Sequence, residues 1–338
     1  MRIAVTGGTG YLGAHTVRAL LKAGHQVKLL ALTHEADSHV VTELSALGPV
    51  DVLTGDVRTH STVTELLRGV DAVVHAAGVV GTSERQARLM WEINAHAGEA
   101  VLTRAVEAGL DPVVSVSSYS ALFPPPDGVI SADSPTAPGR SAYAKTKGYA
   151  DRVARRLQQA GAPVVVTYPS SVVGSPFHTD VGVTERGWAP ILRAGVAPRV
   201  RGGMQMVDVR DVADVHVRLM QAGRGPRRYV CGGHLVTFDE MIDALEVGLG
   251  RRVRRVRVAP GALRTFGRFA DAAGRFLPLT DGLSYEAAWL LTSATPTDDR
   301  ATTADLSLNW RDPRATIAES VRDRLTHRDG EQLGDPRP

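Results

Sequence analysis

A tyrosine and a lysine one helical turn apart are the residues of this chain best suited to chemistry. They are Tyr143 and Lys147, in the run Ser-Ala-Tyr-Ala-Lys-Thr-Lys. A phenol with a pKa of about 10 is a poor base, but a cation on the same helical face stabilises the phenolate and lowers that pKa. The pair predicts reversible proton transfer to a substrate oxygen. Lys145 points elsewhere, and an ordinary surface pair on an amphipathic helix is the alternative.

Serine side chains follow a buried strand upstream of this pair. Residues 112–116 are typical of a strand, and Ser117-Ser118-Tyr119-Ser120 comes directly after it. A hydroxyl at the carboxyl end of such a strand can hydrogen-bond a reacting carbonyl or alcohol. We choose Ser118 for this role, with Ser117 and Ser120 as fallbacks. A serine that caps a turn or helix is the competing explanation.

A glycine-rich turn near the start of the chain predicts a dinucleotide cofactor. Residues 2–6 are typical of a strand and residues 12–22 of a helix, with glycines spaced between them in the G-x-G-x-x-G form. Such a turn needs close approach of backbone to phosphate and tight helix–strand packing. N–H groups at the helix start favour a pyrophosphate. The predicted cofactor residues here are Gly7, Thr9, Gly10, Tyr11, Leu12 and Gly13.

Two later strands should reach the same cofactor. The strand at residues 50–54 is followed by Asp56 and Val57, which we expect near the adenine, although Asp56 could instead cap the next helix. The strand that begins at residue 71 ends in Ala76-Ala77-Gly78. Small side chains there let the backbone lie against the dinucleotide.

The strand at residues 25–32 should end beside the adenosine ribose. An acidic residue there is typical of NAD sites, and an arginine accommodates the extra phosphate of NADP. This chain offers Ala31-Leu32-Thr33-His34, which contains neither. Without a carboxylate to repel a phosphate, we slightly favour NADP over NAD.

Taken in order along the chain, these motifs resemble the extended short-chain dehydrogenase/reductase family, the NAD-dependent epimerases and dehydratases. The resemblance implies that Tyr143 is the general acid/base, that Lys147 holds the nicotinamide ribose and tunes the tyrosine, and that Ser118 orients the substrate oxygen. It also implies that Asn94 supports the site, although a buried amide closing its own hydrogen bonds is an equally good account. The motifs that carry it are Thr6-Gly7-x-x-Gly10-x-x-Gly13, Asp56-Val57, His75-Ala-Ala-Gly78, Asn94, Ser117-Ser118, Tyr143-x-x-x-Lys147, Pro169-Ser-Ser-Val172-Val-Gly174 and Val207-Asp-Val-Arg-Asp211.

Alternating strands and helices predict an α/β fold, a Rossmann-type doubly wound parallel sheet. The resemblance adds a smaller, discontinuous C-terminal substrate-binding domain, a homodimer, and cofactor contacts from Pro169 and Val172. We expect residues 1–168, with 206–233 returning in part, to form the dinucleotide-binding domain. Residues 169–205 and 234–327 would then form the substrate-binding domain, and residues 328–338 a flexible tail.

The predicted substrate is an apolar secondary alcohol or ketone. Nucleotide-sugar members of the family commonly carry Arg-x-x-Asn after the sixth strand, where this chain has Tyr168-Pro169-Ser170-Ser171. Further on, Met204 and Met206 stand where those members place an arginine, and methionines offer an adaptable apolar wall. The chain is most similar to the 3β-hydroxysteroid dehydrogenase and dihydroflavonol reductase-like branch. Arg199 or Arg201 could still serve a phosphate. A nucleotide-sugar epimerase or dehydratase, and a non-catalytic NAD(P)-sensing protein, are the alternatives.

Composition sets the remaining expectations for this chain of 338 residues. A net charge of +3 with 22% charged and 43% hydrophobic residues is typical of a globular enzyme. One cysteine, Cys231, cannot form an internal disulfide, and the chain begins in a strand, so we expect a cytoplasmic protein. We expect no metal in the active site. We also expect no nucleic-acid partner, because no aromatic platform is interleaved with the basic residues.

Apolar residues recur at helical spacing after Pro260, flanked by arginines. They are Leu263, Phe266, Phe269, Ala270, Ala273, Phe276 and Leu277. We favour a helix that buries this stripe in the core and solvates its arginines. A basic amphipathic helix lying on an anionic membrane surface is the alternative.

Overall fold

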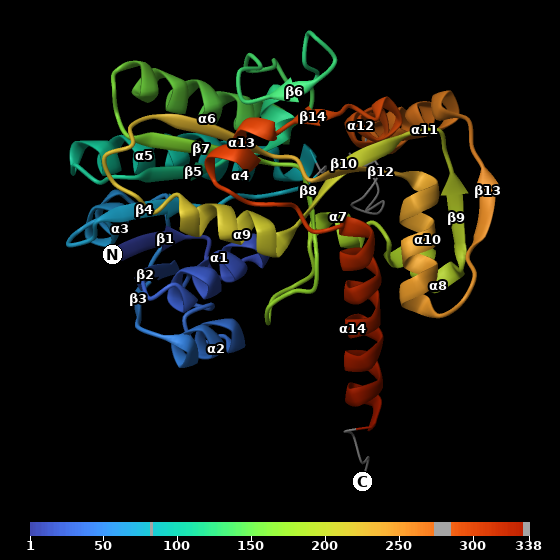
Figure 1. The fold of residues 1–338 in the computed structure, drawn as a ribbon, viewed down its shortest axis with the longest axis horizontal. Helices are drawn as coiled ribbons and strands as arrows, with labels where there is room; N and C mark the ends of the chain where they lie inside the picture. Colours follow the sequence, from blue (N-terminus) through green and yellow to red (C-terminus); the bar gives the residue numbers. More distant parts are fainter. Residues whose placement is uncertain (82–83, 274–284, 334–338) are drawn as a thin grey trace.

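A seven-stranded parallel sheet lies at the centre of the protein (Figure 1), in a computed structural model that describes residues 1–81, 84–273 and 285–333. The strand order is β11-β7-β5-β4-β1-β2-β3, and every neighbouring pair is parallel. The order reverses between β1 and β4, which is where doubly wound sheets bind ligands. The predicted Rossmann-type α/β fold is confirmed. The strands are β1 (Arg2–Thr6), β2 (Gln26–Ala31), β3 (Val50–Thr54), β4 (Ala72–His75), β5 (Val113–Val116), β7 (Val164–Pro169) and β11 (Arg227–Cys231).

Helices cover both faces of this sheet because successive strand residues turn to opposite faces. In β1, Ile3 and Val5 enter one hydrophobic cluster and Ala4 enters another. The first cluster lies under α1 (Tyr11–Lys22), α2 (His39–Leu47) and α9 (Val209–Arg218). The second lies under α3 (His60–Leu66), α5 (Gly98–Glu107) and α6 (Ala142–Gln159). Short pieces complete this layer: η1 (Glu84–Gln86), α4 (Ala87–Met90), the π-helix η2 (Trp91–Ala97) and the 3-10 helix η3 (Tyr119–Leu122).

A smaller unit is built beside the main sheet from later segments (Figure 1). Its three-stranded sheet has the order β12-β10-β8, and two short pairs, β13 with β9 and β14 with β6, lie outside it. The strands are β6 (Ile130–Ser131), β8 (Ser171–Val173), β9 (Val196–Arg199), β10 (Gly203–Asp208), β12 (His234–Thr237), β13 (Arg254–Arg257) and β14 (Thr297–Asp298). The helices are α7 (Val183–Arg186), α8 (Ala189–Ala194), α10 (Phe238–Leu249), α11 (Pro260–Ala273), α12 (Tyr285–Ser293) and α14 (Pro313–Leu333), whereas α13 (Arg300–Asp305) lies against the main sheet.

We expected residues 206–233 to return to the main sheet, and a second, later segment also returns to it. Thr302 of α13 donates a hydrogen bond to the carbonyl of Val230 in β11, and Leu306 is buried in the core beneath α1 and α9. We therefore propose that residues 300–310 belong with the dinucleotide-binding unit. At the far end, α14 continues to Leu333, so residues 328–333 of the expected tail are helical. The rest of that expected tail, 334–338, lies outside the described residues.

The helix predicted after Pro260 exists as α11, but its burial differs from our prediction. Leu263 packs against the hydrophobic core of the smaller unit, whereas Phe266 and Phe269 are 63% and 69% exposed. The expectation that this apolar stripe faces the core is therefore wrong for both phenylalanines. Two other members of the stripe, Phe276 and Leu277, lie outside the described residues.

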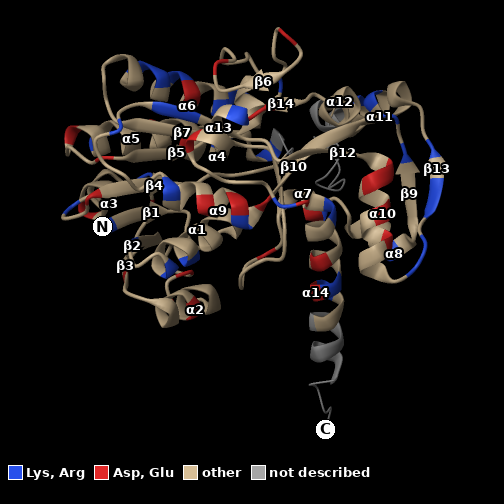
Figure 2. Ribbon diagram, in the orientation of Figure 1, with Lys and Arg blue, Asp and Glu red and all other residues tan. Residues whose placement is uncertain are grey.

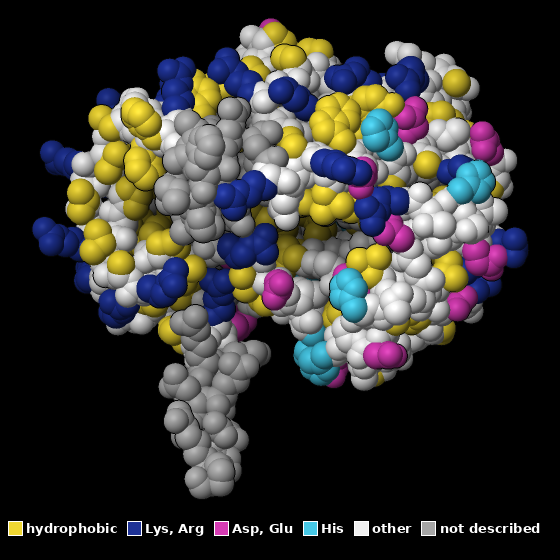
Figure 3. All heavy atoms as spheres, turned by 180° about the vertical axis from the view of Figure 1, so that it is seen from behind, with side chains coloured by type: hydrophobic (Ala, Val, Ile, Leu, Met, Phe, Trp, Pro, Cys, Tyr) yellow, Lys and Arg dark blue, Asp and Glu magenta, His cyan; other side chains and the backbone are white. Residues whose placement is uncertain are grey.

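Charged side chains of both signs are spread over the surface. On β13, Arg255 pairs with Asp243 and Glu246 of α10, so part of the basic strand faces an acidic helix (Figure 2). From behind, Lys and Arg side chains lie among hydrophobic ones on both halves of the molecule (Figure 3). Within the described ranges, no helix combines the length and apolarity that crossing a bilayer requires.

Candidate active site and dinucleotide cradle

The glycine turn between β1 and α1 is as tight as the sequence motif requires. Gly7 has a φ of +71°, and a Cβ on it would lie 2.6 Å from the backbone nitrogen of Ala77. A Cβ on Gly13 would lie 1.9 Å from the carbonyl oxygen of Gly7. Thr9 is half-buried and Gly10 is exposed. Backbone packs on backbone here, which leaves room for a phosphate at the turn.

The first turn of α1 presents backbone donors with no side-chain partner. Its N-cap residue is Gly10, which makes no side-chain cap hydrogen bond. The first N–H groups of a helix lack intrahelical acceptors, so those of Tyr11, Leu12 and Gly13 suit an anion. The side chains point elsewhere: Leu12 packs on the core, and the Tyr11 hydroxyl donates to the carbonyl of Gly174 at 2.7 Å. The residues present therefore fit a dinucleotide pyrophosphate.

The end of β4 closes the other side of the turn. The backbone N–H of Ala77 donates to the hydroxyl of Thr6 at 3.2 Å, and that hydroxyl also contacts Nδ1 of His75 at 2.8 Å. Burial, and then the charge of Lys147, lower the pKa of His75 to about 3, so its imidazole is neutral. Ala76 and Gly78 complete this small-residue segment, as predicted from their size.

Asp56 and Val57 lie between β3 and α3. The Asp56 carboxylate accepts hydrogen bonds from the backbone and guanidinium of Arg58, which lowers its pKa. The N-cap of α3 is Thr59, so Asp56 does not cap that helix. The Val57 side chain is buried in the core under α3 and α5. Any contact of Val57 with a cofactor would therefore use its backbone.

Ser118 and Tyr143 face each other from two elements. Ser118 is the N-cap of η3, where the Ser118 hydroxyl accepts from the backbone of Ser120 at 3.2 Å. Tyr143 lies in the first turn of α6, whose N-cap Ser141 accepts from the backbone of Ala144. Burial raises the pKa of the Tyr143 phenol, and a hydrogen bond with Ser118 acts in the opposite sense. Ser117 is buried and its hydroxyl finds no partner within the described residues.

Lys147 lies under Tyr143 on α6. Its ammonium group is 6.0 Å from the centre of the tyrosine ring and donates to the carbonyl of Val116 at 3.1 Å. Burial lowers the pKa of Lys147 to about 8. We expected the lysine to lower the pKa of Tyr143, but burial dominates and raises it. Lys145 is exposed on the other side of the helix, as predicted.

Asn94 joins three parts of the site. Its side-chain oxygen accepts from the backbone of Val79 at 2.7 Å, and its amide nitrogen donates to the Val79 carbonyl at 3.0 Å. The same nitrogen reaches the hydroxyl of Thr146 at 3.3 Å, and that hydroxyl donates to the carbonyl of Tyr143. Asn94 therefore fixes the segment after β4 relative to the start of α6. It is placed within a π-helix, η2.

Pro169 ends β7 and Val172 lies in β8, the strand that pairs with β10 through Val172 and Val207. Pro169 is buried and Val172 is half-buried. They stand at the carboxyl end of the sheet, where the main sheet gives way to the smaller one.

Two features of this region were missed from the sequence. Glu35 bends back so that its carboxylate accepts from the backbone of Leu32 at 3.0 Å, which puts an acidic group just beyond β2. In the sequence, this acidic residue stands four positions past the end of β2 at Ala31. In addition, the ring of Phe123 packs against Trp289 at 4.9 Å, and the guanidinium of Arg140 lies 4.4 Å from that indole. Trp289 comes from α12, far away in sequence, so spacing alone gave no signal.

Comparisons with known proteins agree with this geometry. Residues 3–232 match the model of the NAD dependent epimerase/dehydratase family. Sterol demethylase protein B of Methylococcus capsulatus is 27% identical over 326 residues, which are 95% of this chain and 97% of that protein. A putative dihydroflavonol 4-reductase of Synechocystis is 27% identical over 73% of this chain and 72% of its own. UDP-glucose 4-epimerase of Neisseria meningitidis serogroup B is 25% identical over 74% and 83%.

A solved structure has a similar fold. The dTDP-glucose 4,6-dehydratase DesIV of Streptomyces venezuelae, with NAD and TYD bound, superposes with a TM-score of 0.75 at 25% identity over 98% of both chains. The glycine turn, the parallel sheet and these matches lead to one conclusion. The chain belongs to the NAD-dependent epimerase/dehydratase family of extended short-chain dehydrogenases/reductases, and it is an oxidoreductase of that family.

Proposed function

We propose that this enzyme transfers a hydride between a nicotinamide dinucleotide and an apolar secondary alcohol or ketone of sterol or flavonoid type. The observation that carries the proposal is the half-buried Tyr143 phenol, which faces Ser118 at the carboxyl end of β5 and has Lys147 beneath it. When bound, the dinucleotide supplies the hydride donor or acceptor.

Each residue of this group has a distinct task in the proposal. Tyr143 gives a proton to, or takes one from, the substrate oxygen. The raised pKa keeps its phenol protonated at neutral pH, which suits it to donate a proton to a ketone. Ser118 orients the same oxygen by a hydrogen bond. Lys147 supplies a buried positive charge next to the phenol, and Asn94 holds the start of α6 in place through Thr146.

The surroundings favour an apolar substrate over a nucleotide sugar. Tyr168, which stands where the nucleotide-sugar members carry their arginine, is fully buried and donates to Asp151 at 2.5 Å, so this position offers nothing to a diphosphate. Arg199 is held by Asp239 at 3.0 Å. Aromatic rings of Phe123 and Trp289 lie next to the segment that carries Ser118. The sterol demethylase relative, which aligns over almost the whole chain, supports the same substrate class.

The position of Met206 changes our expectation that Met204 and Met206 form an apolar wall for the substrate. Its side chain is fully buried in the core of the smaller unit, and Met204 packs partly buried against the same core. These residues therefore support the sheet beside the site. Phe123 is buried in a core as well, so Trp289, which is only partly buried, is the aromatic ring that favours an apolar substrate.

For the cofactor, the position of Glu35 changes our preference from NADP to NAD. Its carboxylate stands just beyond β2, where an acidic group suits the ribose hydroxyls of NAD and repels a 2′-phosphate. Fluorescence titration with NADH and NADPH tests this: NADH should bind more tightly, and Glu35→Gln should reduce the difference. Tighter binding of NADPH to the unaltered protein would contradict it.

The substrate proposal is tested with a panel under the preferred dinucleotide. The panel contains cholesterol and its 3-ketone, dihydroquercetin and its 4-alcohol, UDP-glucose and dTDP-glucose. We expect net oxidation or reduction of the dinucleotide with the apolar compounds only. Conversion of either nucleotide sugar without net change of the dinucleotide would establish the epimerase or dehydratase alternative. Dinucleotide binding with no turnover of any member would favour the sensing alternative.

A further inference from the structure

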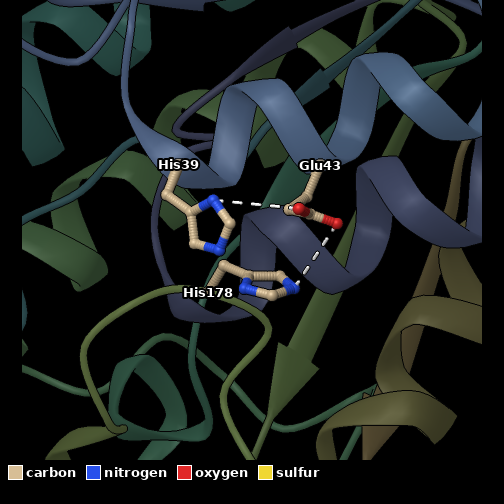
Figure 4. A group of neighbouring side chains, drawn as sticks. All are labelled: His39, Glu43 and His178. Atoms are coloured by element: carbon tan, nitrogen blue, oxygen red, sulfur yellow. Dashed lines mark ion pairs between the residues drawn. The ribbon is translucent and has the colours of Figure 1, made fainter. Parts of the chain in front are cut away.

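Two histidines and a glutamate meet on the surface away from the active site (Figure 4). His39 and Glu43 lie one turn apart on α2, and His178 comes from the segment that follows β8. Nδ1 of His39 is 3.8 Å from one carboxylate oxygen of Glu43, and Nε2 of His178 is 3.8 Å from the other. One potential ligand atom from each residue lies within 4.8 Å of the others.

The backbone holds His178 in an unusual conformation that brings its ring to this cluster. Its φ is +52°, in the left-handed region that non-glycine residues rarely adopt. The neighbouring Phe177 ring contacts the His178 ring with centres 4.7 Å apart, and the guanidinium of Arg18 lies 4.8 Å from the centre of the Phe177 ring. The carbonyl of Ser175 also contacts Nε2 of His15 at 3.0 Å. Segment 174–182 is thus anchored to α1, and His178 turns from it toward α2.

The chemistry of the three side chains suits a particular kind of ion. Two imidazoles and one carboxylate are zinc ligands, whereas calcium and magnesium prefer oxygen alone. His39 and His178 are 66% and 36% exposed, so water has access to a fourth position. The two rings meet edge to face with centres 4.4 Å apart, and one nitrogen of each ring, Nδ1 of His39 and Nε2 of His178, faces Glu43.

We propose that His39, Glu43 and His178 bind one zinc ion, which fastens segment 174–182 to α2. The segment matters because Gly174 and Gly182 both contact Tyr11 at the start of α1. The Tyr11 hydroxyl donates to the Gly174 carbonyl, and a Cβ on Gly182 would lie 2.8 Å from the Tyr11 ring. The ion would therefore stabilise the wall beside the glycine turn. This site is separate from the active site and does not depend on the proposed function.

Zinc titration of the full chain tests the proposal. The purification tag is removed, metal is stripped with a chelator, and zinc is added in competition with a chromophoric chelator. We expect one zinc per chain and a rise in the melting temperature on binding. His39→Ala, Glu43→Gln and His178→Ala should each weaken binding by more than the roughly tenfold cost of losing an outer partner of a zinc ligand.

His34→Ala is the matched control, because His34 is an exposed histidine in the turn that precedes α2 and lies outside the cluster. It should leave zinc affinity and the melting-temperature rise unchanged. His39 is largely exposed, so His39→Ala should retain the fold, which circular dichroism checks. Failure of the unaltered protein to take up zinc, or zinc affinity in the three cluster variants that is unchanged from that of the unaltered protein, would overturn the proposal. In that case the cluster is only a pair of histidine–glutamate contacts.

Discussion

The glycine turn of α1 and the helix α11 differ in how tightly their residues are packed. At the turn, backbone packs on backbone so closely that one added methyl group at Gly13 would lie 1.9 Å from a carbonyl oxygen. At α11, two phenylalanines are more than half exposed, and a Cβ on Gly261 would meet nothing within 4 Å. An added side-chain atom would therefore clash at Gly13 of the glycine turn, whereas at Gly261 of α11 there is space for one.

We relate the tight packing of the glycine turn to cofactor binding and the looser packing of the smaller unit to substrate choice. NAD and NADP share the same pyrophosphate, so a turn that holds either cofactor would need one backbone shape. Substrates differ, and the pieces that would contact them, such as Trp289 of α12, come from the smaller unit. Changes in the first region should therefore cost activity and stability, whereas changes on α11 should be tolerated.

The largest effect is expected from Tyr143→Phe. Removing the phenol hydroxyl deletes the proposed proton donor, so kcat should fall by about 10²–10⁴. Dinucleotide affinity should change little. The matched control is Tyr149→Phe, on the same helix, whose hydroxyl donates to Glu99 at 2.5 Å away from the site. Steady-state kinetics decide the matter: equal rates in the two variants would remove Tyr143 from the mechanism.

Buried histidines should make the dinucleotide-binding half sensitive to acid. Burial is the main cause that lowers the pKa of His15 to about 4, of His75 to about 3 and of His216 to about 4, from 6.5. Because the folded pKa values are depressed, the stability that these groups contribute is present above pH 6.5 and is lost as the pH falls toward 3–4. At about 1.4 kcal/mol per pKa unit, the loss is on the order of a few kcal/mol for each histidine.

Urea unfolding measured between neutral and acidic pH checks this prediction. His216→Gln removes one proton acceptor and should flatten the acid side of the profile, whereas the exposed His34→Gln should leave it unchanged. An identical acid slope in both variants would show that carboxylates, and not these histidines, set the acid limit.

Gly13→Ala and Gly261→Ala compare the two regions directly. The Gly13 variant should lose about 1–3 kcal/mol of stability through overpacking and bind NADH poorly, because the turn must shift. The Gly261 variant should be as stable as the original or gain up to about 1 kcal/mol, since alanine favours a helix. Thermal unfolding and NADH titration supply the numbers. Equal stability of the two variants would mean that the turn is looser than described.

The smallest effect is expected from Phe266→Ser. This side chain is 63% exposed, so its removal from α11 should change the free energy of unfolding by no more than about 0.5 kcal/mol. Denaturant unfolding would measure it. A loss of several kcal/mol would indicate that another surface covers the helix and would restore our original expectation of burial.

Much of the dinucleotide half was predictable because its signals are local. The glycine spacing and the alternation of strands and helices placed β1, β3 and α1 within a residue or so of their bounds. Tyr143 and Lys147 could be proposed from their spacing of one helical turn and Ser118 from its place directly after a strand, and the structure brings the three side chains near one another. The pKa shifts of Tyr143 and Lys147 could not be predicted, because burial by remote segments outweighs the effect of a neighbouring charge.

The remainder depends on contacts between distant parts of the chain. Glu35 could not be linked to the end of β2 without the shape of the turn. Phe266 and Phe269 had the right spacing for a buried stripe, but no element packs over them within the described residues. Likewise His178 reaches His39 and Glu43 only through the fold. Periodicity shows which face of a helix is apolar, and it does not show whether a partner covers that face.

The account is tested most directly by following the hydride itself. The protein is mixed with NAD and the alcohol that turns over fastest in the panel, labelled with deuterium on its carbinol carbon, and the dinucleotide is analysed by mass spectrometry. The account predicts that deuterium moves into the NADH formed by the unaltered enzyme and that Tyr143→Phe, although it binds NAD, forms almost none. Deuterium that stays in the organic product or is lost to solvent would contradict the proposed hydride transfer.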